Sequence, residues 1–225
     1  MTVYLLCLRA FQYLIEGKSK ASNEFHVNKE ALRIIFQTCS NKNRHIRDAS
    51  FSLLCSILSA NVLELDKTLL EIISRNLSLG LSDNWSHVRL AASIATRNFL
   101  IKNSEYEEYL NNLLPGMCLN RYYLAEGVKL YSQDTWLLVF KTNGKFHVEK
   151  HLNDVVDYYL KQANVHNTVT REAACAAIGE LFSKIDKNLL KVYLDELFKV
   201  LSNCFDCESW TVCDGNLLKI EVLSI

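Results

Sequence analysis

A short sequence motif recurs four times along the chain at almost constant intervals. In each copy a β-branched or polar residue precedes a basic one, and two small or semi-small residues follow after one variable position. The basic position recurs after 42, 40 and 42 residues. A period of about 40 residues is typical of stacked structural repeats, so this regularity constrains the fold more than any other feature. The four copies are Ile46-Arg47-Asp48-Ala49-Ser50, Val88-Arg89-Leu90-Ala91-Ala92, Val128-Lys129-Leu130-Tyr131-Ser132 and Thr170-Arg171-Glu172-Ala173-Ala174.

A series of leucines has the same period, with intervals of 40, 42 and 42 residues. Each leucine lies in a stretch where apolar residues recur at helical spacing, which predicts an amphipathic helix. The motif with the basic residue then marks a second helix in the same period. The chain has 7 glycines and 1 proline, whereas all-β folds use both residues freely in turns, so the composition also favours helices. The leucines are Leu70, Leu110, Leu152 and Leu194.

Together the two series predict one solenoid segment over residues 1–225, built from helix pairs. A weaker fifth copy of the motif, residues 212–216, has Cys213 in place of the base. The sequence opens inside a helix-like stretch and closes on an apolar one. Because solenoids need polar capping repeats, we predict a fragment of a longer array. The expected repeats are residues 1–26 (partial), 27–63, 64–103, 104–145, 146–186 and 187–225 (divergent).

The motif resembles the V-R-x-A-A hallmark of the HEAT repeat family, which is part of the armadillo-like helical superfamily. Residues 88–92 match the hallmark at every position, and residues 170–174 match it at all but the first. The resemblance covers roughly residues 27–216. It implies an all-α fold, a right-handed solenoid of antiparallel helix pairs with about four to five repeats. Because such arrays serve many processes, the resemblance is specific for the fold and not for the function.

The row of bases has two interpretations. The resemblance implies a structural role, in which each base reaches an acid or a carbonyl in the turn of an adjacent repeat. The small residues beside the bases would then let neighbouring helices approach closely. In the alternative, the row is a basic ladder that grips an acidic peptide. We favour the structural interpretation. The row consists of Arg47, Arg89, Lys129 and Arg171.

The stretch that is least like the family pattern is rich in aromatic residues. It contains Arg121, Tyr122 and Tyr123, and Trp136 lies in the same repeat. Because arginine and large aromatic side chains are frequent anchors in protein interfaces, we predict these four residues as partner-binding. Such residues are as often part of a core, and this alternative stays open. Pro115 lies upstream and is expected to end the preceding helix, since proline lacks a backbone N–H.

Charge and cysteine content narrow the class of partner. The 25 basic and 25 acidic side chains balance, which argues against a nucleic-acid binder with its basic footprint. No stretch approaches the ~18 apolar residues of a membrane span, so no membrane partner is expected. The cysteines are scattered among apolar residues as reduced thiols would be, which favours the cytoplasm, with the nucleus possible. The opening residues 1–17 lack a basic n-region, and a buried helix is preferred there over a signal peptide.

Two groups of residues invite a metal interpretation. Cys204-x-x-Cys207 has Cys213 close by, but structural zinc needs a fourth ligand and none lies near. His147 and His151 have the i, i+4 spacing of a metal pair, which by itself is weak evidence. We therefore expect no metal site. No catalytic, phosphate-binding or dinucleotide motif is present, so we expect no catalytic residues, no cofactor and no small-molecule substrate.

Residues 141–145, Lys-Thr-Asn-Gly-Lys, contain the asparagine–glycine pair of a tight β-hairpin turn. The repeat phase places them instead between two helices, and we predict a helix-linking loop.

The resulting function is a non-enzymatic scaffold or adaptor that captures a protein partner on a curved helical surface. Within this class, a cytoskeletal (tubulin-binding) module and a transport-receptor module are alternatives. An enzyme with a site hidden in the solenoid is a remote one, because no acid, base or nucleophile stands at suggestive spacing.

Overall fold

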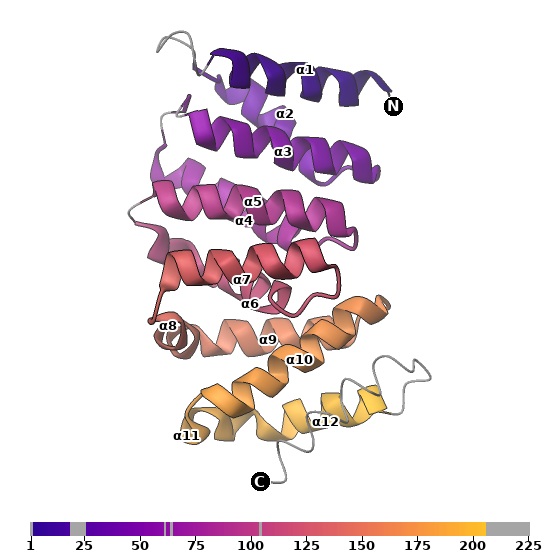
Figure 1. The fold of residues 1–225 in the computed structure, drawn as a ribbon, viewed down its shortest axis with the longest axis vertical. Coiled ribbons are helices and arrows are strands. Elements are labelled where there is room, and N and C mark those ends of the chain that lie inside the picture. The colour runs from indigo at the N-terminus through magenta and orange to yellow at the C-terminus, as the bar shows by residue number, and fades with distance from the viewer. Residues whose placement is uncertain (1, 19–25, 61, 64, 104, 206–225) are drawn as a thin grey trace. The chain divides into compact units, whose positions relative to one another are not determined.

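The computed structural model describes residues 2–18, 26–60, 62–63, 65–103 and 105–205. Within these ranges every regular element is helical (Figure 1). The chain forms two compact units, residues 1–113 and 114–225, and the division falls inside one helix. The fifth motif copy and the apolar end of the sequence lie outside the described residues.

In the first unit, three helices lie side by side, and two further helices pack on them (Figure 1). The middle helix of the three is buried on several faces, with Phe51, Leu53, Leu54 and Ile57 wholly inaccessible to solvent. The side-by-side helices are α1 (Thr2–Lys18), α3 (Arg44–Ala60) and α5 (Ser86–Lys102), and the other two are α2 (Lys29–Cys39) and α4 (Lys67–Leu81).

The second unit continues with the same helix pairs. Here α10 packs on α9, and α12 packs on both. The short 3-10 helix η1 (Tyr106–Tyr109) precedes α6 (Leu110–Asn120), in which the division between the units falls. The elements that follow are α7 (Glu126–Phe140), α8 (Gly144–Lys150), α9 (Leu152–Ala163), α10 (Thr168–Lys184), α11 (Lys187–Leu190), η2 (Lys191–Tyr193) and α12 (Leu194–Phe205).

The second helix of each pair begins in register with the motif. Helices α3, α5, α7 and α10 begin at residues 44, 86, 126 and 168, in each case three residues before the base. The predicted first helices are present as α4, α6, α9 and α12. The all-α solenoid of helix pairs is therefore confirmed.

Polar side chains start several of these helices by accepting the amide hydrogens that a first turn leaves unpaired. The Asn28 side chain accepts from Ala31 N at 2.8 Å and begins α2. Asp66 accepts from Leu69 N at 2.7 Å and begins α4. Asn167, which lies in one of the polar segments between helices, accepts from Thr170 N at 3.3 Å and begins α10.

The small residues of the motif lie where helices meet. Ala92 in the first unit and Ala174 in the second have no exposed surface. Gly80 on α4 extends the close approach, because a Cβ atom there would lie 2.5 Å from both Ala92 Cβ and Phe51 Cζ. A side chain at this position would overlap both neighbours unless they shifted, and glycine, which has none, fits here.

The prediction that Pro115 ends a helix is wrong. Pro115 lies inside α6, which continues to Asn120. The missing N–H removes one helical hydrogen bond, but every residue from 113 to 120 is buried. Burial of this whole stretch offsets the lost bond, so packing decides the helix boundary here.

The interpretation of residues 141–145 as a helix-linking loop agrees with the structure, because α7 ends at Phe140 and α8 begins at Gly144. Lys141 has a positive φ of 50°. Gly144 lies against Trp136, where a Cβ atom would be 2.6 Å from the indole ring. Among the described helices, none is long and apolar enough to cross a membrane.

Candidate functional site

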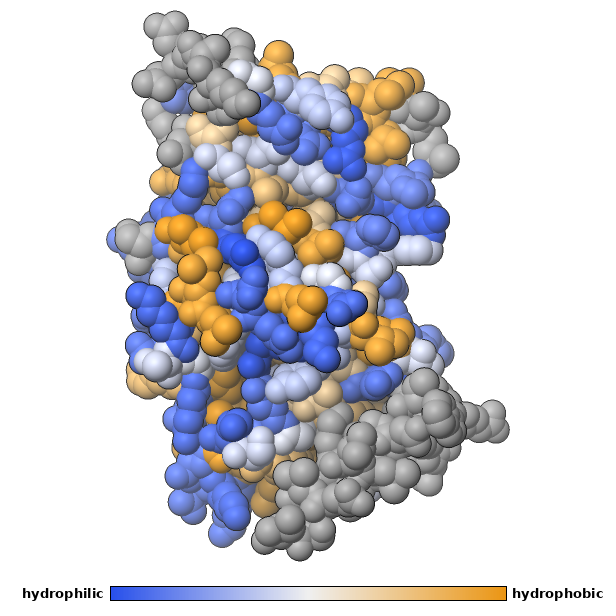
Figure 2. Space-filling model, viewed as in Figure 1, coloured by the Kyte–Doolittle hydropathy of each residue, from blue (hydrophilic) through white to orange (hydrophobic). Residues whose placement is uncertain are grey.

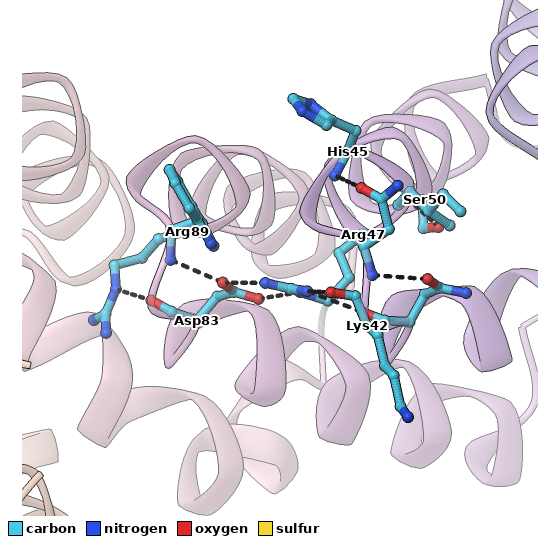
Figure 3. Close-up of polar contacts among 10 residues, drawn as sticks. Lys42, His45, Arg47, Ser50, Asp83 and Arg89 are labelled. Atoms are coloured by element: carbon cyan, nitrogen blue, oxygen red, sulfur yellow. Dashed lines mark hydrogen bonds and ion pairs between the residues drawn. The ribbon is translucent and has the colours of Figure 1, made fainter. Parts of the chain in front are cut away.

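The row of bases was the first candidate for a site, and in the first unit it forms a polar network (Figure 3). Arg47 on α3 makes a bidentate ion pair with Asp83, with Nε 2.6 Å from Oδ2 and Nη2 2.9 Å from Oδ1. Asp83 belongs to the turn between α4 and α5, so this pair joins two successive repeats. The side chains of Arg47 and Asp83 are only 16% and 9% exposed, which strengthens a bidentate pair relative to one in open solvent.

Three of the four bases also bind a turn of their own repeat, six residues back. Arg47 Nη1 donates to Asn41 O at 2.9 Å, and Arg89 Nε donates to Asp83 O at 2.9 Å. Arg171 Nη1 donates to Val165 O at 2.9 Å. The shared geometry explains why a base stands at this position, because the carbonyls at the end of a first helix lack helical partners.

These contacts favour the structural interpretation of the row over the peptide-gripping one. Arg89 is completely buried, so its guanidinium cannot meet a partner in solvent. The contacts also refine the expectation, since the carbonyl acceptors lie in the base's own repeat, while Arg47 in addition reaches an acid, Asp83, in the next. Lys129 differs from the arginines because its side chain is exposed.

The second candidate, around Arg121, is an internal cluster of the second unit. Arg121 Nη1 lies 3.0 Å from Glu180 Oε1, and its Nη2 pairs with Glu180 Oε2. The guanidinium stacks over the Trp136 ring, 4.0 Å from the centroid, and lies 5.6 Å from the centroid of the Tyr122 ring. Gln133 Nε2 donates to Arg121 O at 3.1 Å, which holds the turn between α6 and α7.

Burial governs the chemistry of this cluster. Cys118 has no exposed surface, and burial raises the pKa of its thiol to about 11. Burial likewise raises the pKa values of Tyr122 and Tyr159 well above those of exposed phenols. At neutral pH the thiol and both phenols are therefore neutral, and the charges of the cluster are those of Arg121 and Glu180. None of the neutral groups is prepared for nucleophilic or base catalysis.

The structure brings three of the four predicted partner-binding residues together. The Arg121 guanidinium lies against the rings of both Tyr122 and Trp136, whereas Tyr123 is 3% exposed and belongs to the core. The Arg121 side chain is itself only 12% exposed. These positions favour the core alternative for Arg121 and Tyr123, and their partner-binding role stays a prediction. Sequence reasoning missed Glu180, because it lies 59 residues from Arg121 with no local pattern to link them.

A different surface is open to a partner. Along α7 the apolar side chains of Leu130, Leu137 and Leu138 are 54%, 66% and 53% exposed. Their spacing of seven and eight residues puts them along one side of the helix. Figure 2 shows apolar groups at the surface over α7, separated by polar ones. We call these three leucines the α7 stripe.

The possible metal ligands do not assemble within the described ranges. No group of three or more His, Cys, Asp or Glu side chains there has the arrangement of a metal site. His147 is buried and packs against Phe140, with ring centroids 5.1 Å apart. Cys207 and Cys213 lie outside the described residues.

Comparison with known proteins agrees with this geometry. Residues 23–122, somewhat less than half of the chain, match the family model described as IPO5-like, TPR repeats. This match is consistent with the HEAT/armadillo-like pattern of the motif. Its period of 40 to 42 residues falls within the ~40–47 of HEAT and armadillo repeats rather than the ~34 of tetratricopeptide repeats.

Solved structures with a similar course of the chain include two designed armadillo repeat proteins. One is 14% identical to this chain; the similarity covers 97% of this chain and 92% of the designed protein, with a TM-score of 0.49. The other, designed for modular peptide recognition, is 12% identical, covers 97% of both chains and has a TM-score of 0.45. No curated protein matches the sequence. The resemblance to HEAT/armadillo-like repeats therefore rests on the helix pairs, their motif and the family-model match over residues 23–122.

Proposed function

We propose that this chain is a non-enzymatic scaffold that captures a protein partner on the exposed face of its second helices. One observation supports the proposal most directly: the α7 stripe, Leu130, Leu137 and Leu138, is more than half exposed. Covering apolar surface of this kind with a partner is favourable by about 25 cal/mol per Å². The three leucines offer an amphipathic partner helix a row of contacts at helical spacing.

The arrangement of polar groups supports a binding rather than a catalytic role. The arginines Arg47, Arg89 and Arg121 are occupied in holding turns and neighbouring helices. The thiol of Cys118 and the phenol of Tyr159 are held neutral by burial. A catalytic site needs titratable groups that converge on an accessible substrate position, and these groups are committed to the core. The spread of buried thiols favours a reducing compartment, the cytoplasm or the nucleus.

The test is quantitative capture from cell extract by the full chain and by two surface variants. Leu130→Glu combined with Leu137→Glu places two charges in the α7 stripe and is expected to reduce capture of the principal partner at least tenfold. The matched control is Leu79→Glu on α4, a leucine that is 58% exposed on the first helix of a pair. Equal loss of capture in both variants, or no loss in the α7 variant, would contradict the proposal.

A second candidate is a transport-receptor module, one of the alternatives within the scaffold class. It is favoured over the tubulin-binding alternative by the match of residues 23–122 to a model of IPO5-like repeats, which are importin-β-like repeats. The distinguishing measurement is entry of the fluorescently labelled chain into nuclei of permeabilised cells, with co-sedimentation on microtubules run in parallel. Nuclear entry faster than that of an inert protein of equal size would support transport. Co-sedimentation alone would instead support the tubulin alternative.

A further inference from the structure

Helix α1 uses its charged side chains against α3 and leaves an apolar side exposed. It is the outermost of the three side-by-side helices of the first unit and packs on α3 (Figure 1). Arg9 Nη2 lies 2.8 Å from Asp48 Oδ2 on α3. Glu16 Oε1 accepts a hydrogen bond of 2.8 Å from Ser56 Oγ, also on α3. Charges ordinarily occupy the solvent-facing side of a surface helix, so this arrangement is reversed.

The exposed side of α1 is an apolar seam with the spacing of a helix-packing surface. Its large side chains include Val3, Leu6 and Tyr13, which are 70%, 62% and 69% exposed. Positions 3, 7, 10 and 14 recur after four and three residues in alternation, which is how one helix packs along another. The seam contains no Lys, Arg, Asp or Glu. We call the following exposed residues the α1 seam: Val3, Leu6, Cys7, Ala10, Tyr13 and Leu14.

The α1 seam is complementary to itself when two copies run antiparallel with Ala10 at the centre. Position 3 then lies opposite position 17 of the second copy, and positions 6 and 7 lie opposite positions 14 and 13. Val3 meets Gly17, where nothing lies within 4 Å of an added Cβ atom. Cys7 likewise meets the larger Tyr13. Ala10 faces its own counterpart, and its small side chain lets the two backbones approach closely.

We propose that the α1 seam is the interface of a homodimer, in which α1 packs antiparallel on α1 of a second copy about a two-fold axis at Ala10. Such an interface is isologous, with the same surface on both copies. The seam and the flanking Tyr4, 59% exposed, give two copies on the order of 1,000 Å² to bury, which reaches the lower limit for a specific interface. Because the seam carries no charge, no like charges meet within it. This inference is independent of the proposed scaffold function, whose α7 stripe shares no residue with the seam.

The first measurement is sedimentation of the full chain in reducing buffer across micromolar concentrations, where we expect a reversible dimer. Leu6→Glu places a charge in each half of the interface and should raise the dissociation constant at least tenfold. Leu79→Glu on α4 is the matched control, because Leu79 is 58% exposed and lies outside the seam. It should leave the dissociation constant unchanged. Both leucines are largely exposed, so both variants should keep the fold, which circular dichroism checks.

A second charge tests the direction of the two helices. In the antiparallel pair, position 6 of one copy lies beside positions 13 and 14 of the other. Adding Tyr13→Lys to Leu6→Glu therefore sets each new carboxylate near the new ammonium group of the second copy, and the dimer should regain stability relative to Leu6→Glu alone. In a parallel pair the two new carboxylates would face each other, and the double variant would stay dissociated.

Cross-linking tests the position of the two-fold axis. In the Cys7→Ser, Ala10→Cys variant the two introduced thiols lie at the centre of the interface, within reach of a disulfide. Mild oxidation should then yield a covalent dimer of the tryptic peptide 10–18. In the wild-type chain the two Cys7 thiols are offset by about 9 Å along the helix axes, because each lies three residues from the centre. The wild-type peptide 1–9, which contains Cys7, should therefore cross-link to its counterpart much more slowly.

Three results would each overturn the proposal. The first is a wild-type chain that stays monomeric at every concentration, which would leave the seam to another protein or to no partner. The second is an equal effect of Leu6→Glu and Leu79→Glu on the dissociation constant. The third is a double charge variant that dimerises no better than Leu6→Glu, or a Cys7 thiol that cross-links as fast as the thiol introduced at position 10.

Discussion

Arg47 in one repeat grips Asp83 in the next through two hydrogen bonds of 2.6 and 2.9 Å, across 36 residues of sequence. The same carboxylate accepts the backbone N–H of Trp85 at 2.9 Å, just before α5 begins. One acidic residue therefore both ties α3 to the following helix pair and organises the turn that starts α5.

Breaking the ion pair between Arg47 and Asp83 should lower the stability of the fold substantially. Arg47→Ala leaves the Asp83 carboxylate largely buried without its cation, and we expect the free energy of unfolding to fall by about 2–4 kcal/mol. The measurement is urea unfolding of the full chain, followed by circular dichroism. Arg33→Ala is the control, because Arg33 pairs with Glu30 while their side chains are 58% and 64% exposed, and exposed pairs contribute only ~0–1 kcal/mol. Equal effects in the two variants would contradict the prediction.

Two glycines predict effects of opposite sign for the same substitution. Glycine to alanine within a helix ordinarily stabilises by up to about 1 kcal/mol. At Gly17 on α1 nothing lies within 4 Å of the added methyl group, so Gly17→Ala should raise the free energy of unfolding. At Gly80 the methyl group would overlap Ala92 and Phe51, so Gly80→Ala should lower it by about 1–3 kcal/mol. Thermal melting of both variants checks the sign, and a Gly80→Ala protein more stable than the wild type would refute the close approach.

A larger side chain in place of a buried alanine of the motif should destabilise the fold. Ala174 on α10 has no exposed surface, and Ala174→Leu should destabilise the fold by about 1–3 kcal/mol through overpacking. Ala176 on the same helix is partly exposed, so Ala176→Leu should cost less. A comparison of the two melting temperatures checks the prediction, and an unchanged melting temperature for Ala174→Leu would show that the site has room.

Glu16 on α1 predicts a pH effect. Its pKa lies below the ordinary 4.5, first because Ser56 Oγ donates a hydrogen bond of 2.8 Å to Oε1 and second because Gln12 donates another. A carboxyl group with a lowered folded-state pKa stabilises the fold above its unfolded pKa and loses that contribution as the pH falls through the folded value. Ser56→Ala should therefore raise the pKa of Glu16, as measured by NMR titration of its carboxyl carbon. No shift would mean that Ser56 does not bind Glu16 in solution.

The fold could be predicted from the sequence because two independent series, the bases and the leucines, report the same period. Each second helix starts three residues before the base, and in three of the four copies the arginine donates to a turn carbonyl six residues back. The boundary at Pro115 could not be predicted, because local backbone chemistry indicates a stop while burial of residues 113–120 favours continuation. Only the three-dimensional packing shows which effect prevails.

The candidate site was less predictable. Arginine beside aromatic residues is typical of an interface and equally of a core, and it is the ion pair with Glu180 on α10 that favours the core alternative for Arg121. Glu180 has no local relation to Arg121 in the sequence. The α7 stripe was likewise missed, because Leu130, Leu137 and Leu138 look like ordinary apolar positions of an amphipathic helix until their exposure is known.

The hydrogen bonds from the arginines to carbonyls six residues earlier suggest an order of events in folding during synthesis. A bond from Arg89 to the carbonyl of Asp83 closes a loop so short that its entropic cost is small, and contacts of this kind form early. As a helix pair emerges from the ribosome, we expect the hydrogen bond between its arginine and its own turn to form first. Its link to the next pair, as between Arg47 and Asp83, can form only when about 36 more residues have been synthesised.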